Sequence, residues 1–419
     1  MPSKLTRRDF LKLAALSLAA TAGGKRLVDL QTSLADQTPD RPNVIIILFD
    51  TLSARHLPIY GYPRNTAPNL SHFAENAIVY HNHHAAANST MPSTSSLLTG
   101  TYPWTHRAFF GTPTKTSNEK NVFNLVNHRY KNAAYTQNLL ADMILHQFGD
   151  SLDRHVESDA FSLVSSPAFQ STNQLFNRDG LLATVSSEGY YFSNKNKAGS
   201  LFLSILDRLY VEGRFKSLEE QLKQTYPEGI PYIWLHNVYF TQEAIFDGLM
   251  DILDDLPTPF FSYFHLWSPH EPYRPGGEFI GLFNDEWEPK GKPIHFFGDS
   301  RMSNAQLNQY RLKYDENIAH VDAEFGRLMR YLDDRGLLQN SYVIVTSDHG
   351  QMFERGIHGH VTRLLYEPLL HIPLLISQPG QRGRQDIYSL NSNVDLLPTL
   401  MHISDLPIPE WCEGRVLAG

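Results

Sequence analysis

The sequence predicts an α/β fold, a three-layer sandwich in which a large, mostly parallel sheet is flanked by helices on both faces. Four short aliphatic runs have the composition of buried strands, and an amphipathic helical pattern lies between two of them. Three of the four runs end in Asp or His. In open sheets of this kind, ligands bind beyond the carboxyl ends of the strands. The sequence therefore predicts both the layers and the edge that carries the site.

The first predicted strand is the continuous aliphatic run over residues 44–49, which ends in Asp50. The other three are "TPFFSYFHLWSPH", which ends near His270, "SYVIVTSDHG", which ends in Asp348-His349-Gly350, and "HIPLLISQPG", which carries no recognisable chemistry. Aliphatic side chains at successive rather than alternate positions are typical of strands that are buried on both faces.

A helix is predicted between the "SPH" and "SYVIV" strands and is expected to stop at Gly336. Its apolar positions are Ile318, Val321, Phe325, Leu328, Met329 and Leu332. Strands that alternate with such helices imply a parallel sheet covered on both faces.

The N-terminus predicts an export signal. "LTRRDFLKLAALSLAATAGG" places Arg7-Arg8 before a short, mildly apolar stretch and a small-residue cleavage site, as in twin-arginine signals. The alternative is an amphipathic first helix of the mature fold. We interpret residues 1–30 as the signal and 31–42 as a linker. We expect the twin-arginine export machinery as a partner, a periplasmic, cell-surface or extracellular location, and no transmembrane helix in the mature chain.

The remainder is interpreted as one domain over residues 43–410 with a tail over 411–419. Between residues 110 and 255 the pattern weakens, and this region is interpreted as rich in insertions that shape substrate access. Within it, "SSPAFQSTNQLFN" and "YYFSNKNKAG" are expected to be loops, and "KSLEEQLKQTY" a surface helix.

The composition argues against two classes of interaction. The 44 acidic and 36 basic residues give a formal net charge of −8, and no long basic run is present, so no nucleic acid partner is expected. Cys412 is the single cysteine, so the chain forms no internal disulfide.

Asp50, Asp348 and His349 form a candidate metal-ligand set of two carboxylates and one imidazole. Such a set suits Mn, Zn or Fe better than Ca, which prefers oxygen ligands throughout. Taken singly, an Asp after a strand is more often a helix cap or a loop residue. The three residues together favour the metal site.

The stretch "NSTMPSTSSLLTG", residues 88–100, predicts a helix N-terminus that presents Ser89, Thr90 or Ser93. The backbone N–H groups and the helix dipole favour an anion at such a point. A hydroxyl that is coordinated there by a divalent cation can attack a phosphorus or sulfur centre. The alternative is a plain Ser/Thr-rich cap.

The sequence resembles the sulfatase family of the alkaline phosphatase superfamily from about Arg41 to Leu406. "RPNVIIILFDTLSARHLPIYGYPRNTAPNL" is similar to the family's opening strand, metal Asp, YGY loop and TPNL helix. "TMPSTSSLLTGTYP" is similar to the Cys/Ser-x-Pro-Ser-Arg signature. "HLWSPHEPY", "SYVIVTSDHG", "YEPLLHIPLLISQPG" and "NVDLLPTLMHIS" follow in the family's order. The resemblance implies an alkaline-phosphatase-like sandwich. It also implies a small C-terminal subdomain, which is expected to be absent because the chain stops at Gly419.

Four departures from the family pattern bear on chemistry. Thr90 replaces the Cys or Ser that sulfatases oxidise to formylglycine, so no formylglycine is expected. Thr94 replaces the signature Arg, Thr51 the second metal Asp, and His349 the usual Asn. The resemblance then points to the family branch with a Thr nucleophile and a transition-metal-like site.

For that branch the resemblance implies a nucleophile and a metal site. Thr90 would be the nucleophile and would form a phosphothreonine intermediate. The metal ligands would be Asp50, Thr90, Asp348 and His349, with Mn or Zn favoured over Ca.

Two further histidines are implied by the resemblance. His270, in "SPHEP", would bind the transferred group or assist the leaving oxygen, with His265 as its rival. His360 would lie where sulfatases place a Lys against the anion, with His358 and Arg363 as rivals. The histidines that precede Thr90 are left out of the site: His81, His83 and His84.

These expectations describe an exported, metal-dependent hydrolase that cleaves a phosphodiester or phosphonate ester through Thr90. The substrate would be a small anionic ester, with glycan and lipid headgroups among the candidates. Three alternatives stay open: a sulfuric ester hydrolase, a phosphoglycerol or phosphoethanolamine transferase, and a catalytically dead relative that binds an anion.

Overall fold

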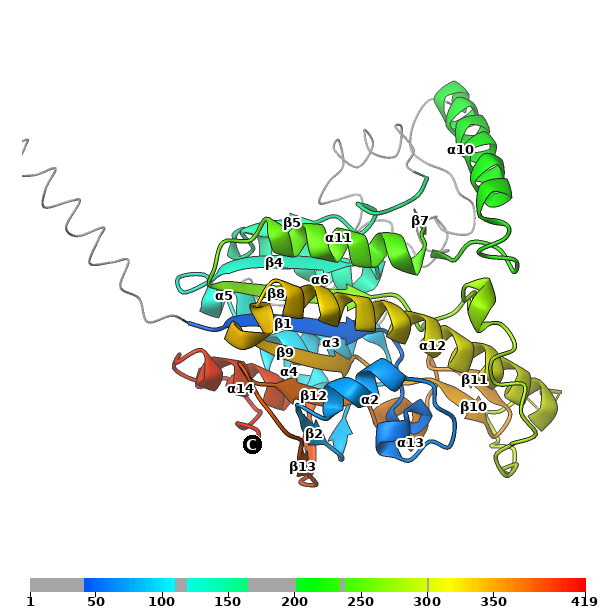
Figure 1. Ribbon diagram of the computed structural model, residues 1–419. Coiled ribbons are helices and arrows are strands. Elements are labelled where there is room, and N and C mark those ends of the chain that lie inside the picture. Colours follow the sequence, from blue (N-terminus) through cyan, green and yellow to red (C-terminus); the bar gives the residue numbers. More distant parts are fainter. Residues whose placement is uncertain (1–40, 110–118, 165–200, 234–237, 300) are drawn as a thin grey trace, which may run out of the picture. The chain divides into compact units, whose positions relative to one another are not determined.

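One large sheet of eight strands forms the centre of the fold (Figure 1). The structure is a computed structural model that describes residues 41–109, 119–164, 201–233, 238–299 and 301–419. The folded unit runs from Pro42 to Gly419. The export signal, most of the linker and the two expected loops of the middle region lie outside the described residues.

The strand order places the predicted aliphatic strands at the middle of the sheet. In spatial order the strands are β13 (Gln385–Ile387), β2 (Ile78–Tyr80), β12 (Leu374–Ser377), β9 (Ser341–Ser347), β1 (Asn43–Phe49), β8 (Phe260–Leu266), β4 (Lys131–Thr136) and β5 (Arg154–Val156). All neighbouring pairs are parallel except those made by β12, which is antiparallel to both β9 and β2. The prediction of a mostly parallel sheet is confirmed.

The register brings the ends of the three central strands together. Phe49 of β1 is paired with Leu266 of β8 on one side and with Ser347 of β9 on the other. The amide of Asp50 extends the ladder by donating to the carbonyl of Leu266 at 2.9 Å. Asp50 and Asp348 therefore emerge from adjacent strands at the same edge.

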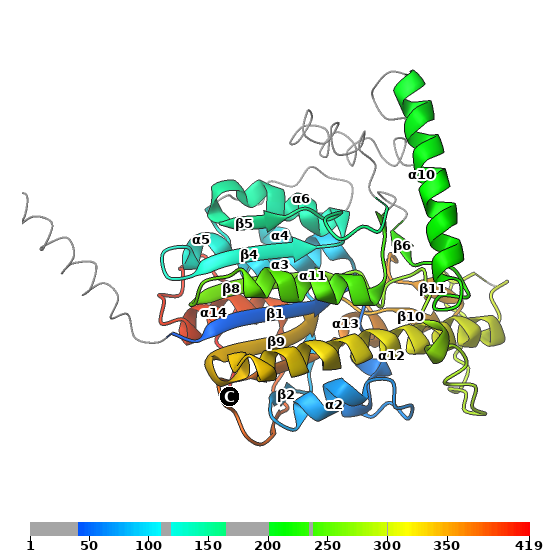
Figure 2. The same cartoon turned by 45° about the horizontal axis from the view of Figure 1, so that its top comes forward.

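Alternate residues of β1 point into two separate cores, which makes the fold three-layered. One core takes Ile45, Ile47 and Phe49 and is covered by α2 (Pro68–Ala74), α11 (Gln242–Asp254) and α12 (Asn304–Asp334). The other takes Val44, Ile46 and Leu48 and is covered by α3 (Thr90–Thr99), α5 (Val122–Val126), α6 (Leu139–Phe148) and α14 (Leu396–Ile403). In Figure 1, α11 and α12 lie in front of the sheet, and Figure 2 shows the same layers after a rotation.

Helix α12 is longer than its apolar pattern predicts. It begins at a capping box formed by Ser303 and Gln306 and ends just before Gly336, whose φ of 67° is left-handed. The predicted apolar positions lie on its buried or half-buried face. Its N-terminal turns, before residue 318, are more polar and were not part of the predicted pattern.

The region expected to be rich in insertions also contributes to the core. β4 pairs in parallel with β8, β5 pairs with β4, and α6 packs beneath them. Its pattern is weak because β4 reads "KNAAYT", which contains no Val, Ile or Leu. The expected surface helix belongs to α10 (Leu201–Leu222), whose side chains from residue 212 onward are mostly exposed.

Short elements complete the described fold. They are β3 (His83–His84) with β14 (Asn391–Ser392), β6 (Tyr232–Ile233) with β7 (Val238–Tyr239), β10 (Met352–Glu354) with β11 (Ile357–Gly359), α4 (Pro103–His106) and α13 (Glu367–Leu370). The expected tail packs onto the second core through Leu417. Among the described helices, none has both the length and the apolarity needed to span a membrane.

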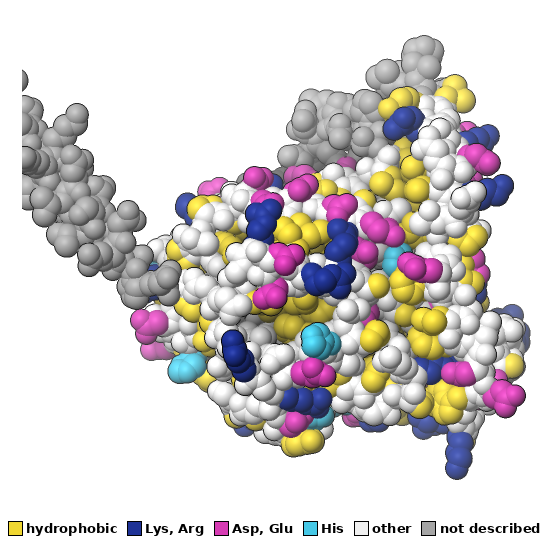
Figure 3. All heavy atoms as spheres, viewed as in Figure 1, with side chains coloured by type: hydrophobic (Ala, Val, Ile, Leu, Met, Phe, Trp, Pro, Cys, Tyr) yellow, Lys and Arg dark blue, Asp and Glu magenta, His cyan; other side chains and the backbone are white. Residues whose placement is uncertain are grey.

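The surface over α11 and α12 carries Lys and Arg side chains interspersed with Asp and Glu (Figure 3). Arg327 pairs with Asp247 and Glu324, and Arg335 pairs with Asp254. Mixed charges of this kind do not make the continuous basic stripe that tracks a nucleic acid backbone.

Candidate active site

Helix α3 presents Thr90 at its first turn, beside the carboxyl edge of the sheet. Ser89 is the N-cap, and Gly100 ends the helix in the left-handed region, where a Cβ would lie 2.8 Å from Cys412 Sγ. The Ser93 hydroxyl is engaged elsewhere, because it donates to the carbonyl of Asp348 and accepts from Asn393. Of the three candidate hydroxyls, the structure brings that of Thr90 to the cluster of carboxylates and imidazoles.

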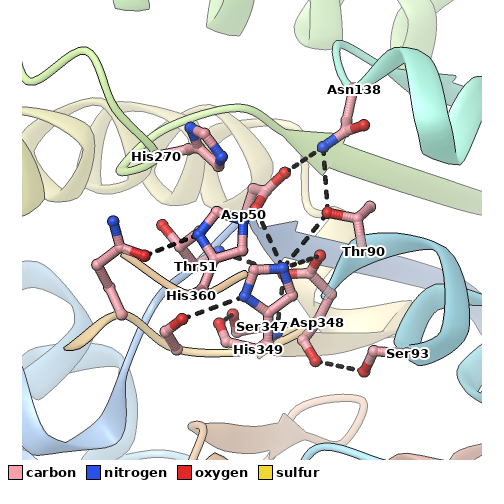
Figure 4. A network of polar contacts seen from close by, with 12 residues as sticks. Asp50, Thr51, Thr90, Ser93, Asn138, His270, Ser347, Asp348, His349 and His360 are labelled. Carbon is pink, nitrogen blue, oxygen red and sulfur yellow. Dashed lines mark hydrogen bonds and ion pairs between the residues drawn. The ribbon is translucent and has the colours of Figure 1, made fainter. Parts of the chain in front are cut away.

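The two predicted carboxylates lie together and are fully buried. Asp348 accepts from the amides of Thr51 at 3.2 Å and His349 at 2.8 Å through one oxygen. His349 Nε2 lies 3.3 Å from the other oxygen of Asp348 and 3.9 Å from Asp50 Oδ1. Thr90 Oγ1 lies 3.3 Å from the same imidazole nitrogen. The four residues expected from the sequence are therefore in one place (Figure 4).

The unsatisfied atoms of this cluster fit a divalent cation. Within the described residues, Asp50 Oδ1 and Asp348 Oδ2 are buried and have no hydrogen-bond partner. His349 donates from Nδ1 to the carbonyl of Gly350 at 3.1 Å, which leaves the Nε2 lone pair facing the carboxylates. Buried charges persist when they are paired or bound to metal. A donor set of two carboxylates, one imidazole and one hydroxyl suits Mn or Zn.

The pKa values of Asp50 and Asp348 are shifted in opposite directions. Burial acts to raise the pKa of Asp50, but the neighbouring imidazoles of His265, His270 and His349 outweigh it and hold that pKa well below its usual range. Burial and the charge of Asp50 raise the pKa of Asp348. Two carboxylates that share a site without a cation are expected to differ in this way.

Asn138 is the site residue that the sequence reasoning missed. Its side-chain amide donates to Asp50 Oδ2 at 2.5 Å and lies 3.3 Å from Thr90 Oγ1. Its side-chain oxygen accepts from the amide of Leu140 at 2.9 Å and so caps α6. The available signal was an Asn between an Ala-rich run and an apolar helical pattern, which predicts a strand end and an N-cap.

His270 and His360 flank the cluster on the side away from Asn138 (Figure 4). His270 donates from Nδ1 to the carbonyl of Glu271 at 2.7 Å, and its ring centre lies 5.0 Å from that of His360. The His360 ring lies 4.4 Å from that of His349, and its Nδ1 is 2.8 Å from the Gln351 side-chain oxygen. Burial, followed by the neighbouring imidazoles, lowers the pKa of His360 well below its usual value.

The rival histidines are placed differently. His265 is fully buried beneath the cluster, and its Nε2 lies 3.5 Å from Asp50 and 3.8 Å from Asp348. His358 stacks on Tyr310. The guanidinium of Arg363 lies over the Phe297 ring. Three histidines have partners outside the cluster: His81 pairs with Asp386, His83 with Asn391 and His84 with Glu367.

Thr51, which follows Asp50, has a φ of 66°. A left-handed conformation is costly for a β-branched residue and is found where the surroundings enforce it. Here the Tyr314 hydroxyl donates to the Thr51 carbonyl at 2.6 Å, while the Thr51 amide donates to Asp348. This strained turn fixes the chain as it leaves β1.

Comparison with known proteins identifies relatives over most of the chain. A family model described as Sulfatase matches residues 42–406. The ulvan-active sulfatase of Formosa agariphila is 24% identical over 388 residues, which cover 91% of this chain and 65% of that protein. Arylsulfatase K of Canis lupus familiaris is 30% identical over 141 residues, which cover 32% of this chain and 26% of the relative. Both matches span less than two thirds of the relative's own length.

Solved structures share the fold. The phosphonate monoester hydrolase of Agrobacterium radiobacter superimposes with a TM-score of 0.63 at 17% identity, over 90% of this chain and 76% of that one. At 17% identity this similarity shows a shared fold and nothing about activity.

Proposed function

This chain belongs to the sulfatase family, and we propose that within the family it is a metal-dependent hydrolase that cleaves phosphodiesters or phosphonate esters through a covalent intermediate on Thr90. The observation that carries the proposal is Thr90 itself. By the motif resemblance it stands where sulfatases carry the residue that is oxidised to formylglycine. It lies at a helix N-terminus, and its hydroxyl is 3.3 Å from His349 Nε2. A threonine cannot be oxidised to the aldehyde, so its hydroxyl is the remaining nucleophile.

Asp50, Asp348, His349 and Thr90 would hold the cation. When bound, a divalent cation at these residues lowers the pKa of a coordinated hydroxyl and offsets the charge of the transferred group. Mn or Zn is favoured over Ca because one ligand is an imidazole nitrogen.

The chain's own residues account for the order of bond changes. Thr90 Oγ loses its proton to solvent and attacks phosphorus, and the bond from phosphorus to the leaving oxygen breaks. His270 donates a proton to that oxygen. Water then attacks the phosphothreonine and loses a proton to His270; the bond from phosphorus to Thr90 Oγ breaks, phosphate leaves, and Oγ regains a proton from solvent.

Two neighbours position the reacting groups. The Asn138 amide lies between Asp50 and Thr90 and orients both. His360, kept neutral by burial, presents its Nε2 lone pair, because Nδ1 donates to Gln351. In that tautomer His360 accepts rather than donates a hydrogen bond, so we assign it a positioning role and assign the proton transfer to His270.

The test is a panel of aryl phosphate, phosphodiester, phosphonate and sulfate esters with added Mn, Zn, Mg or Ca. We expect phosphodiester or phosphonate turnover with Mn or Zn to exceed sulfate turnover. Thr90→Ala should lose this activity by about 10³-fold or more, whereas Thr90→Ser, which keeps a hydroxyl, should retain part of it. Undiminished activity in Thr90→Ala would exclude Thr90 as the nucleophile.

A sulfuric ester hydrolase is the second candidate function, because the two relatives described above are named as sulfatases. The same panel separates the two. Faster turnover of aryl sulfate than of aryl phosphonate, still dependent on Thr90, would favour the sulfatase.

Export by the twin-arginine route is part of the proposal and rests on the Arg7-Arg8 segment. Arg7→Lys/Arg8→Lys should leave the full-length protein in the cytoplasm of a bacterial host, whereas the unchanged chain should reach the periplasm. Cell fractionation followed by immunoblotting measures this. Equal export of both forms would contradict the assignment.

A further inference from the structure

A second group of metal-ligating side chains lies where α6 packs against the edge strand β5. Asp142 and His146 are one turn apart on α6 and lie on the same face of the helix. His155 is in β5, and Glu157 is the first residue after that strand. None of these residues belongs to the candidate active site.

The four side chains converge closely. His155 Nε2 lies 2.7 Å from Asp142 Oδ1, and His146 Nε2 lies 3.5 Å from Asp142 Oδ2. His146 Nε2 also lies 3.6 Å from Glu157 Oε2. One ligand atom from each of Asp142, His146 and His155 lies within 4.8 Å of the others.

Two of these separations are close to those of a tetrahedral site. Bonds of about 2.0–2.1 Å from Zn²⁺ to nitrogen or oxygen place tetrahedral ligand atoms roughly 3.3 Å apart. Two of the measured separations, 3.5 and 3.6 Å, are close to that value. The third, 2.7 Å from His155 Nε2 to the other oxygen of Asp142, is a hydrogen bond that a bound metal would replace. Two imidazoles with two carboxylates also neutralise a dication, which limits the cost of burying it.

We propose that Asp142, His146, His155 and Glu157 form a structural zinc site that fastens α6 to β5. β5 is a strand of three residues at the edge of the eight-stranded sheet, with one neighbouring strand to hold it. A metal ion with ligands from both elements would hold this short strand against α6. Because Asn138 caps the same helix one turn before Asp142, the site would also fix the position of Asn138.

The same side chains also form hydrogen bonds with one another without metal. The hydrogen bonds of Asp142 with His146 and His155 outweigh the effect of burial and lower the pKa of Asp142 to about 2. The competing explanation is an ion-pair cluster without metal, in which the hydrogen bonds with Asp142 and Glu157 outweigh the effect of burial and raise the pKa of His146 to about 10.

The decisive experiment measures zinc content in a background that removes the first site. Asp348→Asn/His349→Gln protein is loaded with ZnCl₂, dialysed, and analysed for zinc per chain. We expect about one equivalent to remain, and expect it to be lost when His146→Gln and His155→Gln are added. Absence of zinc in the background protein, or zinc that survives the added substitutions, would overturn the proposal.

A thermal measurement covers the case in which the combined variant folds poorly. Glu157 is half exposed, so Glu157→Gln should fold normally while weakening zinc binding by about tenfold or more. Zinc should raise the Tm of the Asp348→Asn/His349→Gln protein, and the further change Glu157→Gln should shift this rise to higher zinc concentration. If the residues form only an ion-pair cluster, Glu157→Gln should change the Tm by the same amount with and without zinc, and this result would contradict the proposal.

Discussion

Asn138 is the side chain that joins helix capping to the candidate chemistry. Its amide group contacts both Asp50 and Thr90, while its carbonyl oxygen caps α6. The residue therefore has two functions that a substitution can separate. A small hydroxyl side chain can replace the cap but cannot reach the carboxylate.

We expect Asn138→Ser to lower kcat on the preferred phosphonate or phosphodiester by about 10²-fold, the usual effect of removing one oriented donor from a reacting site. Ser is as good an N-cap as Asn, so the free energy of unfolding should change by less than about 1 kcal/mol. Steady-state kinetics and chemical denaturation measure the two effects.

The matched control is Asn121→Ser, because Asn121 caps α5 in the same way through the amide of Asn124 and lies away from the cluster. It should leave kcat unchanged. Equal kcat values for Asn138→Ser and the unchanged protein would show that the amide contacts are not used in turnover.

At the scale of elements, the short pair β3 and β14 contains a buried histidine that was set aside as a site residue. His83 lies opposite Asn391, and its Nδ1 donates to the Asn391 side-chain oxygen at 2.5 Å. Burial, the largest effect, lowers the pKa of His83 to about 3. The folded protein thus keeps this imidazole neutral well below the pH at which the unfolded chain binds a proton.

This difference makes the fold sensitive to acid. Between pH 6.5 and 3 the unfolded chain carries a proton on His83 that the folded chain excludes, so stability should fall as the pH falls, by at most about 1.4 kcal/mol per unit. His83→Asn keeps a donor near the position of Nδ1 and removes the titration. Its stability should be lower at pH 7, because of lost packing, but should depend less on pH.

Urea denaturation at several pH values between 4 and 7 compares the two proteins. As a control, His72→Asn removes an exposed histidine and should leave the slope unchanged. Parallel stability curves for His83→Asn and the unchanged protein would contradict the expectation.

The sequence predicted those elements whose pattern is strong on its own. The aliphatic runs of β1, β8, β9 and β12 and the apolar stripe of α12 are local signals of burial. β4 was missed because its buried positions are Asn, Ala, Tyr and Thr, and β5 because it is three residues long. Their place in the sheet is decided by pairing with β8, which is a long-range contact.

The same distinction holds for the candidate site. Asp50, Asp348 and His349 follow strands that the sequence shows clearly, so their meeting could be predicted from the parallel sheet. Asn138 follows a strand that was not recognised. His265 was ranked by its motif alone, and its place beneath the carboxylates depends on the register of β8 against β1.

At the scale of the whole molecule, the candidate metal site links stability to metal content. Asp50 and Asp348 are fully buried, and burial together with the charge of Asp50 raises the pKa of Asp348. Without a cation the two carboxylates repel each other, and with one they become its ligands. Asp348 is therefore expected to destabilise the fold when no cation is bound and to stabilise it when one is bound.

Asp348→Asn should therefore stabilise the chelator-treated protein, because the amide keeps an acceptor for Thr51 and His349 without the charge. The free energy of unfolding should rise by on the order of 1 kcal/mol, and the Tm should rise with it. In the presence of Mn or Zn the unchanged protein should have the higher Tm, since it gains stability from the metal and the variant does not. Calorimetry in chelator and in metal measures both.

Asp315→Asn is the matched control, because Asp315 is equally buried but paired with Arg64 and His56. That substitution should lower the free energy of unfolding by about 3–5 kcal/mol in both conditions. A lower Tm for Asp348→Asn in chelator would mean that the histidines around the carboxylates already neutralise them, and that the cluster does not need a cation to be stable.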